Sequence, residues 1–342
     1  MSYFGGWWHH RLTALVLAPA LAPALAALVG CSDSLSSSST DASVTDAGDS
    51  GASAPPARLY VTFVSHNEDN CPLFDSPNFS SAYKANRDAT VAVANAVVAA
   101  GLAWNFESDW TYLLKVPEED ARAGQQNTNG KNIIEWLATS APHHLEVDAH
   151  SHEHGGYNYA DVVKLLIDLG APDTKIVGGF IASPDSEEDW TRLRQPLTGK
   201  KTGFVWTPQI LWGGASPGHV ADLNVSGVWR PKDGAQFLID DPAGNLTSVG
   251  TWWDSEPLKL DGLTDIASRV AAGEFPPGTM LTAAVRLGHC TLARDLDVAL
   301  ADVAAVAALV AEGKAVPATL SDIVATWRST YGSRPFVLAS GR

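Results

Sequence analysis

The sequence predicts an α/β fold in which most strands are parallel. Short runs rich in β-branched and aromatic residues alternate with longer runs of helical character, and this order is typical of a parallel sheet with helices between its strands. The same order returns near the carboxyl terminus. From Arg58 onward no second low-complexity segment and no fixed-period repeat interrupts the chain, so we expect one domain over residues 58–342.

The expected elements follow one another along the domain. In chain order they are a strand at 59–65 (LYVTFVS), a helix at 85–100, a strand at 103–106, a helix at 130–138, a strand at 144–149, a helix at 159–169, a strand at 175–182, a strand at 281–287, an alanine-rich helix at 298–312, a strand at 315–320 and a helix that begins at Ser321. Residues 183–250 are rich in Trp, Gly and Pro and predict long loops, which often carry a binding surface. Chemistry in such folds lies at the carboxyl ends of the strands.

Composition excludes several classes of protein. The 342 residues contain 23 Lys and Arg against 38 Asp and Glu, for a formal charge of −15. A chain this acidic has no general electrostatic reason to bind nucleic acid or an anionic membrane surface. Its 3 cysteines are too few for a disulfide-dense scaffold or a Cys-rich zinc module. We expect a monomeric protein without a nucleic-acid partner.

The amino-terminal segment predicts export. An apolar run at 12–29 follows Arg11, as in a signal peptide, and its two prolines count against a permanent membrane helix. The run ends in Leu-Val-Gly-Cys-Ser at 28–32, which resembles the lipobox of bacterial lipoproteins. The resemblance implies a signal peptide at 1–30, lipidation of Cys31, and an exported protein anchored in a membrane, on its periplasmic side or at the cell surface.

The next segment predicts a tether. Residues 31–57 consist of the expected lipidated cysteine followed by Ser, Asp, Ala, Gly and Pro, with almost nothing large to bury. Such a segment cannot offset its ordering entropy and stays disordered, with a reach of about 25–30 Å. We therefore expect the folded domain to lie near the membrane surface without contacting it.

A histidine cluster follows the third expected strand, in the string EVDAHSHEH at 146–154. His150 and His154 are four residues apart, so in a turn they share one face and can bind one metal ion. If the chain stays extended instead, His150 and His152 share a face, and His154 drops out. A third interpretation is a solvated surface loop without a metal.

The string resembles the second motif of polysaccharide deacetylases of the NodB-homology, carbohydrate esterase family 4 type, which has the form E-x-x-x-H-[ST]-x-x-H. The matching residues are Glu146, His150, Ser151 and His154. Weaker matches occur in the family's order at 60–63, 229–232, 277–289 and 312–321. The resemblance implies a distorted (β/α)7-type barrel, a divalent transition metal with zinc as the default, and removal of acyl groups from a cell-surface or extracellular polysaccharide.

One departure from the family matters for the metal site. Val64-Ser65 stands where the family has Asp-Asp after Thr-Phe, and acidic residues come only at Glu68 and Asp69. In an extended strand His66 and Glu68 would share a face, a pattern similar to that of some metal-dependent glycosidases. We expect Glu68 as third ligand, His66 as an additional ligand and Asp69 as base, unless 66–69 is simply a polar loop.

Further roles are assigned at the ends of the later strands. We expect His289 to act as general acid and Arg230, from the Trp-Arg-Pro-Lys match, to orient the base. Once Cys31 is lipidated, Cys71 and Cys290 form an even pair beside the same rim and are candidates for a disulfide. Tryptophans in the loop region could stack on sugar rings, among them Trp190, Trp206, Trp212, Trp229, Trp252 and Trp253.

Three functions fit these features. The first is a metal-dependent deacetylase acting on a polysaccharide. The second is a surface lipoprotein that binds carbohydrate in the same cleft without catalysis, because the Asp-Asp pair is missing. The third is a metal-dependent glycosidase or amidohydrolase that uses the same barrel.

Overall fold

A computed structural model describes residues 53–68, 71–179, 187–212, 224–250, 260–288 and 290–340. The expected signal peptide, Cys31 and most of the tether lie outside these residues. Within them, no helix combines the length and the apolar character needed to cross a membrane.

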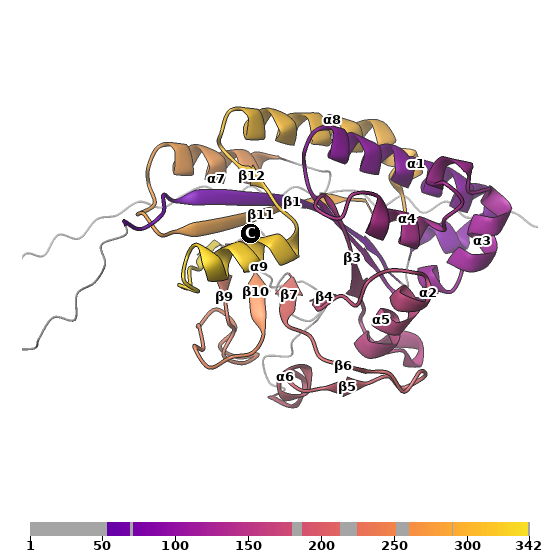
Figure 1. Ribbon diagram of the computed structural model, residues 1–342, viewed down its shortest axis with the longest axis horizontal. Helices are drawn as coiled ribbons and strands as arrows, with labels where there is room; N and C mark the ends of the chain where they lie inside the picture. Colours follow the sequence, from indigo (N-terminus) through magenta and orange to yellow (C-terminus); the bar gives the residue numbers. More distant parts are fainter. Residues whose placement is uncertain are drawn as a thin grey trace, which may run out of the picture. The chain divides into compact units, whose positions relative to one another are not determined.

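The central feature of the domain is a nine-stranded sheet (Figure 1). Its order is β11 (Met280–Leu287), β1 (Arg58–Asn67), β2 (Trp104–Ser108), β3 (Leu145–His150), β4 (Ile176–Gly178), β7 (Ile210–Trp212), β10 (Thr247–Val249) and β9 (Val228–Trp229), with β12 (Val316–Pro317) also paired to β1. Every pair is parallel except β10 with β9. The predicted α/β class with mostly parallel strands is confirmed.

The sheet is not a closed barrel in the part of the chain described. The two ends of the strand order, β9 and β11, form no ladder with each other. Side-chain hydrogen bonds join this region instead. The Thr282 hydroxyl accepts from the Gly227 N–H at 2.9 Å and donates to the Gly250 carbonyl at 2.7 Å, and the Thr282 N–H donates to Ser226 Oγ at 2.9 Å. The expected (β/α)7 barrel is therefore not confirmed.

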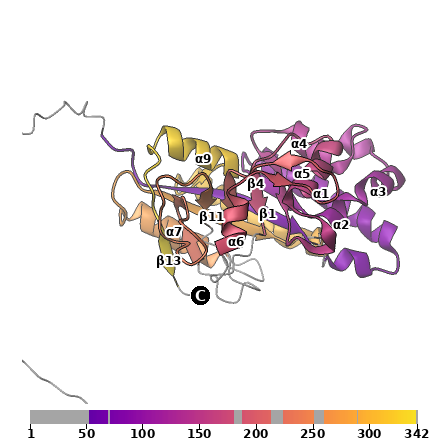
Figure 2. The same ribbon diagram turned by 90° about the horizontal axis from the view of Figure 1, so that it is seen from below.

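The two faces of the sheet pack against different helices. Side chains alternate along β1, so Leu59, Val61 and Phe63 join the core that covers one face, whereas Tyr60 and Val64 join a second core on the other. The helices of the first core include α1 (Phe79–Ala99), α3 (Val116–Ala123), α4 (Ile133–Ser140), α5 (Tyr159–Asp168), α7 (Asp261–Ala271) and α8 (Leu292–Ala311). Helix α9 (Leu320–Ser329) packs in the second core, and Figure 2 shows α9 and α7 on opposite sides of β1 and β11.

Polar side chains anchor the start of α9 beneath the sheet. Thr319 caps the helix by accepting from the Asp322 N–H at 3.3 Å. The next two amides are bound by strand residues, Leu320 N–H by Asn105 Oδ1 at 3.1 Å and Ser321 N–H by Glu146 Oε2 at 3.2 Å. A carboxylate at a helix amino terminus is favourable because the macrodipole is positive there.

The segment between 183 and 250 differs from the expectation of long loops. It contains α6 (Glu187–Leu193), a hairpin of β5 (Leu197–Thr198) and β6 (Val205–Trp206), and β7, β8 (Asn224–Ser226), β9 and β10. Most of the described residues here still lie in loops, so the prediction is wrong only for these elements. Strands of two or three residues are too short to show an alternating pattern. The sequence analysis also missed α2 (Trp110–Leu113), α3, α7 and β13 (Leu338–Ser340), the partner of β8.

One charged residue lies in the packed face of α8. Asp302 belongs to the same buried stripe as Ala299, Val303 and Val306, and only 7% of it is exposed. Its Oδ2 has no hydrogen-bond partner among the described residues. Burial raises the pKa of Asp302 to about 6, because a low-dielectric environment disfavours the carboxylate.

We expect Asp302→Asn to stabilise the protein at pH 8 by about 1–2 kcal/mol. Between the ordinary pKa of about 3.9 and the folded value, the native state binds more protons than the unfolded chain, so the contribution of Asp302 to stability falls as pH rises. The advantage should vanish at pH 4. Urea unfolding at both pH values checks this, with Asp297→Asn on the exposed side of α8 as control. An equal effect of Asp302→Asn at both pH values would contradict it.

Candidate metal centre

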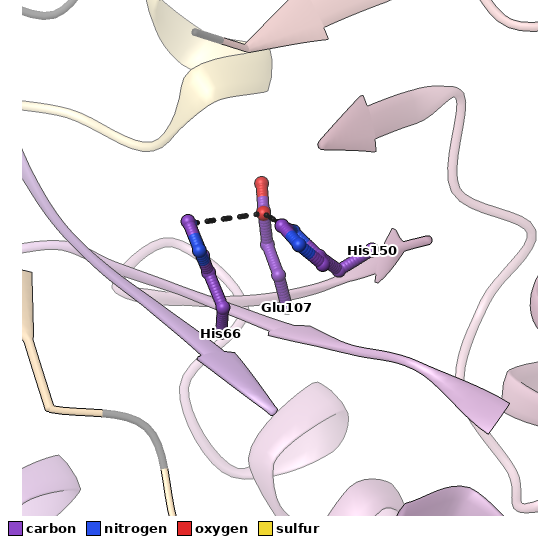
Figure 3. A group of neighbouring side chains, drawn as sticks. All are labelled: His66, Glu107 and His150. Carbon is purple, nitrogen blue, oxygen red and sulfur yellow. Dashed lines mark hydrogen bonds and ion pairs between the residues drawn. The ribbon is translucent and has the colours of Figure 1, made fainter. Parts of the chain in front are cut away.

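Three adjacent strands each end in a side chain that can bind a metal. His66 lies near the end of β1, Glu107 near the end of β2 and His150 at the end of β3. The register pairs His66 with Glu107, and Glu107 with Asp148 two positions before His150. Because side chains at alternate positions share a face, all three project to the same side of the sheet. Figure 3 shows Glu107 between the two histidines.

The two imidazoles stack, with Glu107 along one edge of the stack. The ring centroids of His66 and His150 are 4.2 Å apart, and the planes meet at 26°. Glu107 Oε2 lies 3.1 Å from His150 Nδ1 and 3.5 Å from His66 Nε2. No part of Glu107 is exposed.

Glu68 lies along the opposite edge of the same stack. Its Oε1 is 3.4 Å from His66 Nδ1 and 3.7 Å from His150 Nε2, and its Oε2 is 3.9 Å from His152 Nε2. The side chains of Glu68 and His152 are 13% and 12% exposed. This edge therefore reaches solvent, whereas the Glu107 edge does not.

Two groups of side chains can thus hold a metal ion. One consists of His66, Glu107 and His150, and the other of Glu68, His150 and His152, with the candidate ligand atoms of each group within 4.8 Å of one another. Imidazole and carboxylate donors suit zinc and several other transition metals. The buried Glu107 Oε1 has no hydrogen-bond partner in the described part of the chain, which fits a site that completes its coordination with a cation.

Two glycines leave room for this cluster. A Cβ placed on Gly178, which pairs with His150, would lie 2.1 Å from Glu107 Oε2. A Cβ on Gly179, whose φ is +75°, would lie 2.6 Å from His150 Nε2. No other residue fits at either position without moving the ligands.

The electrostatics of the site favour a cation. Burial raises the pKa of Glu107 well above its usual range, and the neighbouring Asp148 and Glu68 carboxylates raise it further. Burial also raises the pKa of Asp148, with Glu146 adding to the effect. A bound cation would favour the ionised carboxylates and offset part of this cost.

The structure brings some of the predicted residues together. Glu68, His66 and His150 meet in the cluster, and His152 joins them through Glu68. The side chain of His154, and both Asp69 and His289, lie outside the described residues. His150 and His152 both face Glu68, as in the H-x-H alternative, although β3 itself ends at His150. The alternative pair of His150 and His154 stays a prediction.

Arg230 is not part of the cluster. It follows β9, which runs antiparallel to β10, and the pairing of Trp229 with Ser248 places Arg230 toward the amino ends of the parallel strands. There its guanidinium pairs with Asp240 at 2.8 Å and lies 5.3 Å from the Trp327 ring centroid. Arg230 is thus paired with Asp240 away from the cluster, and the predicted base that it was expected to orient, Asp69, lies outside the described residues.

Glu107 is the site residue that the sequence analysis missed. The expected strand ended at Phe106, two residues before the observed end at Ser108, so Glu107 was not assigned to the sheet. The available signal was the alternation of polar Asn105 and Glu107 with apolar Trp104 and Phe106. Glu146, in contrast, lies away from the metal ligands and binds Asn105 and the amino end of α9.

A disulfide joins Cys71 and Cys290, with a Cα–Cα distance of 5.7 Å. It links the loop after β1 to the loop after β11. Two backbone contacts complete the junction: the Cys71 N–H donates to the Glu68 carbonyl at 3.2 Å, and the Cys290 N–H donates to Asn67 Oδ1 at 3.2 Å. The bridge therefore restrains the segment that carries Glu68.

Comparisons with models of known protein families and with curated protein sequences find no match. The chemistry of this centre must therefore be inferred from its own residues.

We expect His150→Ala to abolish tight zinc binding, because His150 belongs to both ligand groups. The loss of affinity should exceed the 10–100-fold or so that follows removal of an outer-shell partner. Isothermal titration of zinc into the metal-free protein measures it, with the exposed His143→Ala as matched control. Equal zinc affinity in the two variants would contradict a metal centre at this position.

We expect the Cys31→Ser variant, which retains only Cys71 and Cys290, to show no free thiol when denatured under non-reducing conditions and two after reduction. Replacing both remaining cysteines by Ser should lower the free energy of unfolding by about 3–5 kcal/mol, because the bridge closes a long loop in the unfolded chain. Thiol titration and urea unfolding test the two statements. Two free thiols before reduction would exclude the bridge.

Proposed function

We propose that this protein is a divalent metal-dependent hydrolase that removes acyl groups from a cell-surface or extracellular polysaccharide. The observation that carries the proposal is the cluster of imidazoles and carboxylates from the ends of three adjacent parallel strands. Such strand ends are where α/β proteins place their chemistry. Zinc is the default ion for this donor set, and the partially exposed edge allows water and substrate to reach it.

We assign the ion to the edge formed by Glu68, His150 and His152. A hydrolytic centre needs an open coordination position, and this edge is the one that reaches solvent. Glu107, fully buried at His150 Nδ1, then acts as a positioning residue. It accepts the Nδ1–H of His150 and so leaves Nε2, which faces Glu68, available for the ion.

A bound divalent ion would supply Lewis acidity and lower the pKa of a coordinated water toward neutrality. The chain's own residues supply the rest. Glu107 and His66 fix the ring of His150 by hydrogen bonding and stacking. Asp69, directly after Glu68, is our proposed base, and His289, directly before the bridged Cys290, is our proposed acid.

Sequence features suggest the class of substrate. Trp110 and Tyr157 follow β2 and β3, the strands that carry Glu107 and His150, but their rings stack on each other at 4.7 Å with 6° between planes and carry no argument for a sugar. The resemblance of 146–154 to the deacetylase motif and the lipobox-like segment at 28–32 point to an acylated glycan outside the cell.

A second candidate is an amidohydrolase or glycosidase that uses the same ion. The observation that favours it is the pairing of both His150 and His152 with Glu68, since an H-x-H pair is typical of amidohydrolase barrels. The candidate functions share the metal centre and differ only in the bond of the substrate that is hydrolysed.

We expect the zinc-loaded protein to release acetate from acetylated chitin or xylan oligomers. Glu68→Gln, which removes a charge from the metal edge, should lower this rate by about 100-fold or more, and Glu107→Gln by about 10–100-fold. His143→Ala should retain the rate of the unmodified protein. Acetate assays at matched zinc occupancy give these ratios.

Other products would contradict the deacetylase assignment. Release of reducing sugar without acetate would indicate a glycosidase, and hydrolysis of cyclic amides an amidohydrolase. Glycan binding with no turnover by the zinc-loaded protein would indicate a binding lipoprotein. A larger loss in Glu107→Gln than in Glu68→Gln would place the ion on the buried edge.

A further inference from the structure

Trp212 ends β7 in the wall of the metal centre. Its strand pairs with β4 and β10, and Val249 lies opposite it. The ring belongs to the core on the face of the sheet that carries His66, together with Val64 and Ile210. The Trp212 and His66 rings form a T-shaped pair, with centroids 4.9 Å apart and planes at 77°.

The polar atom of this ring has no protein partner. Trp212 is 6% exposed, and its indole N–H makes no hydrogen bond with any residue in the described chain. Four other buried tryptophans donate theirs: Trp104 to Ser65 Oγ, Trp206 to the Thr174 carbonyl, Trp229 to the Phe237 carbonyl and Trp327 to the Arg334 carbonyl. A buried donor without an acceptor lowers stability, and such groups in native proteins call for a functional explanation.

We propose that the Trp212 indole N–H binds the oxygen of an acyl group held at the metal centre. This inference rests on the proposed function and names the group that recognises the substrate's carbonyl. Trp212 is suited to the role because its ring is fixed by packing in the second core and by contact with His66. A rigid, neutral donor that needs no reorganisation stabilises the negative charge that develops on a carbonyl oxygen during acyl transfer.

Acetate is the probe for this contact, since it presents the same oxygen atoms as the released acid. In the zinc-loaded protein labelled with ¹⁵N at tryptophan, the indole resonance absent from Trp212→Phe identifies Trp212. We expect this resonance to move downfield on addition of acetate. Trp212→Phe should weaken acetate binding about 10-fold while zinc affinity stays within about twofold, because a hydrogen bond to a charged group is lost and no ligand is.

Trp206→Phe is the matched control. It removes an indole N–H that is bonded to Thr174 outside the site, so it should lower thermal stability more than Trp212→Phe does and leave acetate affinity unchanged. If zinc and acetate bind while the Trp212 resonance stays fixed and Trp212→Phe keeps full acetate affinity, the inference fails and the metal centre stands. If zinc does not bind at all, the proposed function fails, and this inference fails with it.

Discussion

The strand register at the ends of β1, β2 and β3 is the constraint on which the rest of the site depends. It places His66 opposite Glu107, and Glu107 opposite Asp148, on one face of a parallel sheet. Buried carboxylates and imidazoles are costly without counter-charges, and the raised pKa of Glu107 expresses that cost. Other residues accommodate these side chains. Gly178 and Gly179 leave space for Glu107 and His150, and the Cys71–Cys290 bridge restrains the loop that carries Glu68.

The side chains on this face of the sheet differ between the amino ends and the carboxyl ends of the strands. Near the amino ends, Asn105 and Glu146 bind the first amides of α9, which closes that side of the sheet with an apolar core. Toward the carboxyl ends of the strands, the imidazoles and carboxylates of the metal centre lie on this face in place of the apolar core. The amino ends of these strands therefore support the packing of α9, and their carboxyl ends carry the metal centre. Parallel α/β folds generally place their chemistry at the carboxyl ends.

The sequence predicted those features of the fold and site that depend on residues close together in the chain. Alternation along 59–65 and the motif at 146–154 located the strands of His66 and His150, and period-2 spacing correctly brought His66 and Glu68 to one side. Glu107 was not predicted as part of a strand because pairing with the neighbouring strands, and not the local sequence, determines where a strand ends. The short strands between 183 and 250 were not predicted for the same reason. Pairing with other strands sets their register, as β4 and β10 set that of β7, and no local pattern encodes it.

Anomalous diffraction from zinc-soaked crystals locates the bound ion relative to both edges of the histidine stack, and so tests whether the Glu68 edge is the metal site. We predict one strong peak beside Glu68, bound to His150 through Nε2 and to His152, with Glu107 against Nδ1 on the far side of the ring. A peak on the Glu107 edge, bound through Nδ1, or no peak near His150 would contradict it.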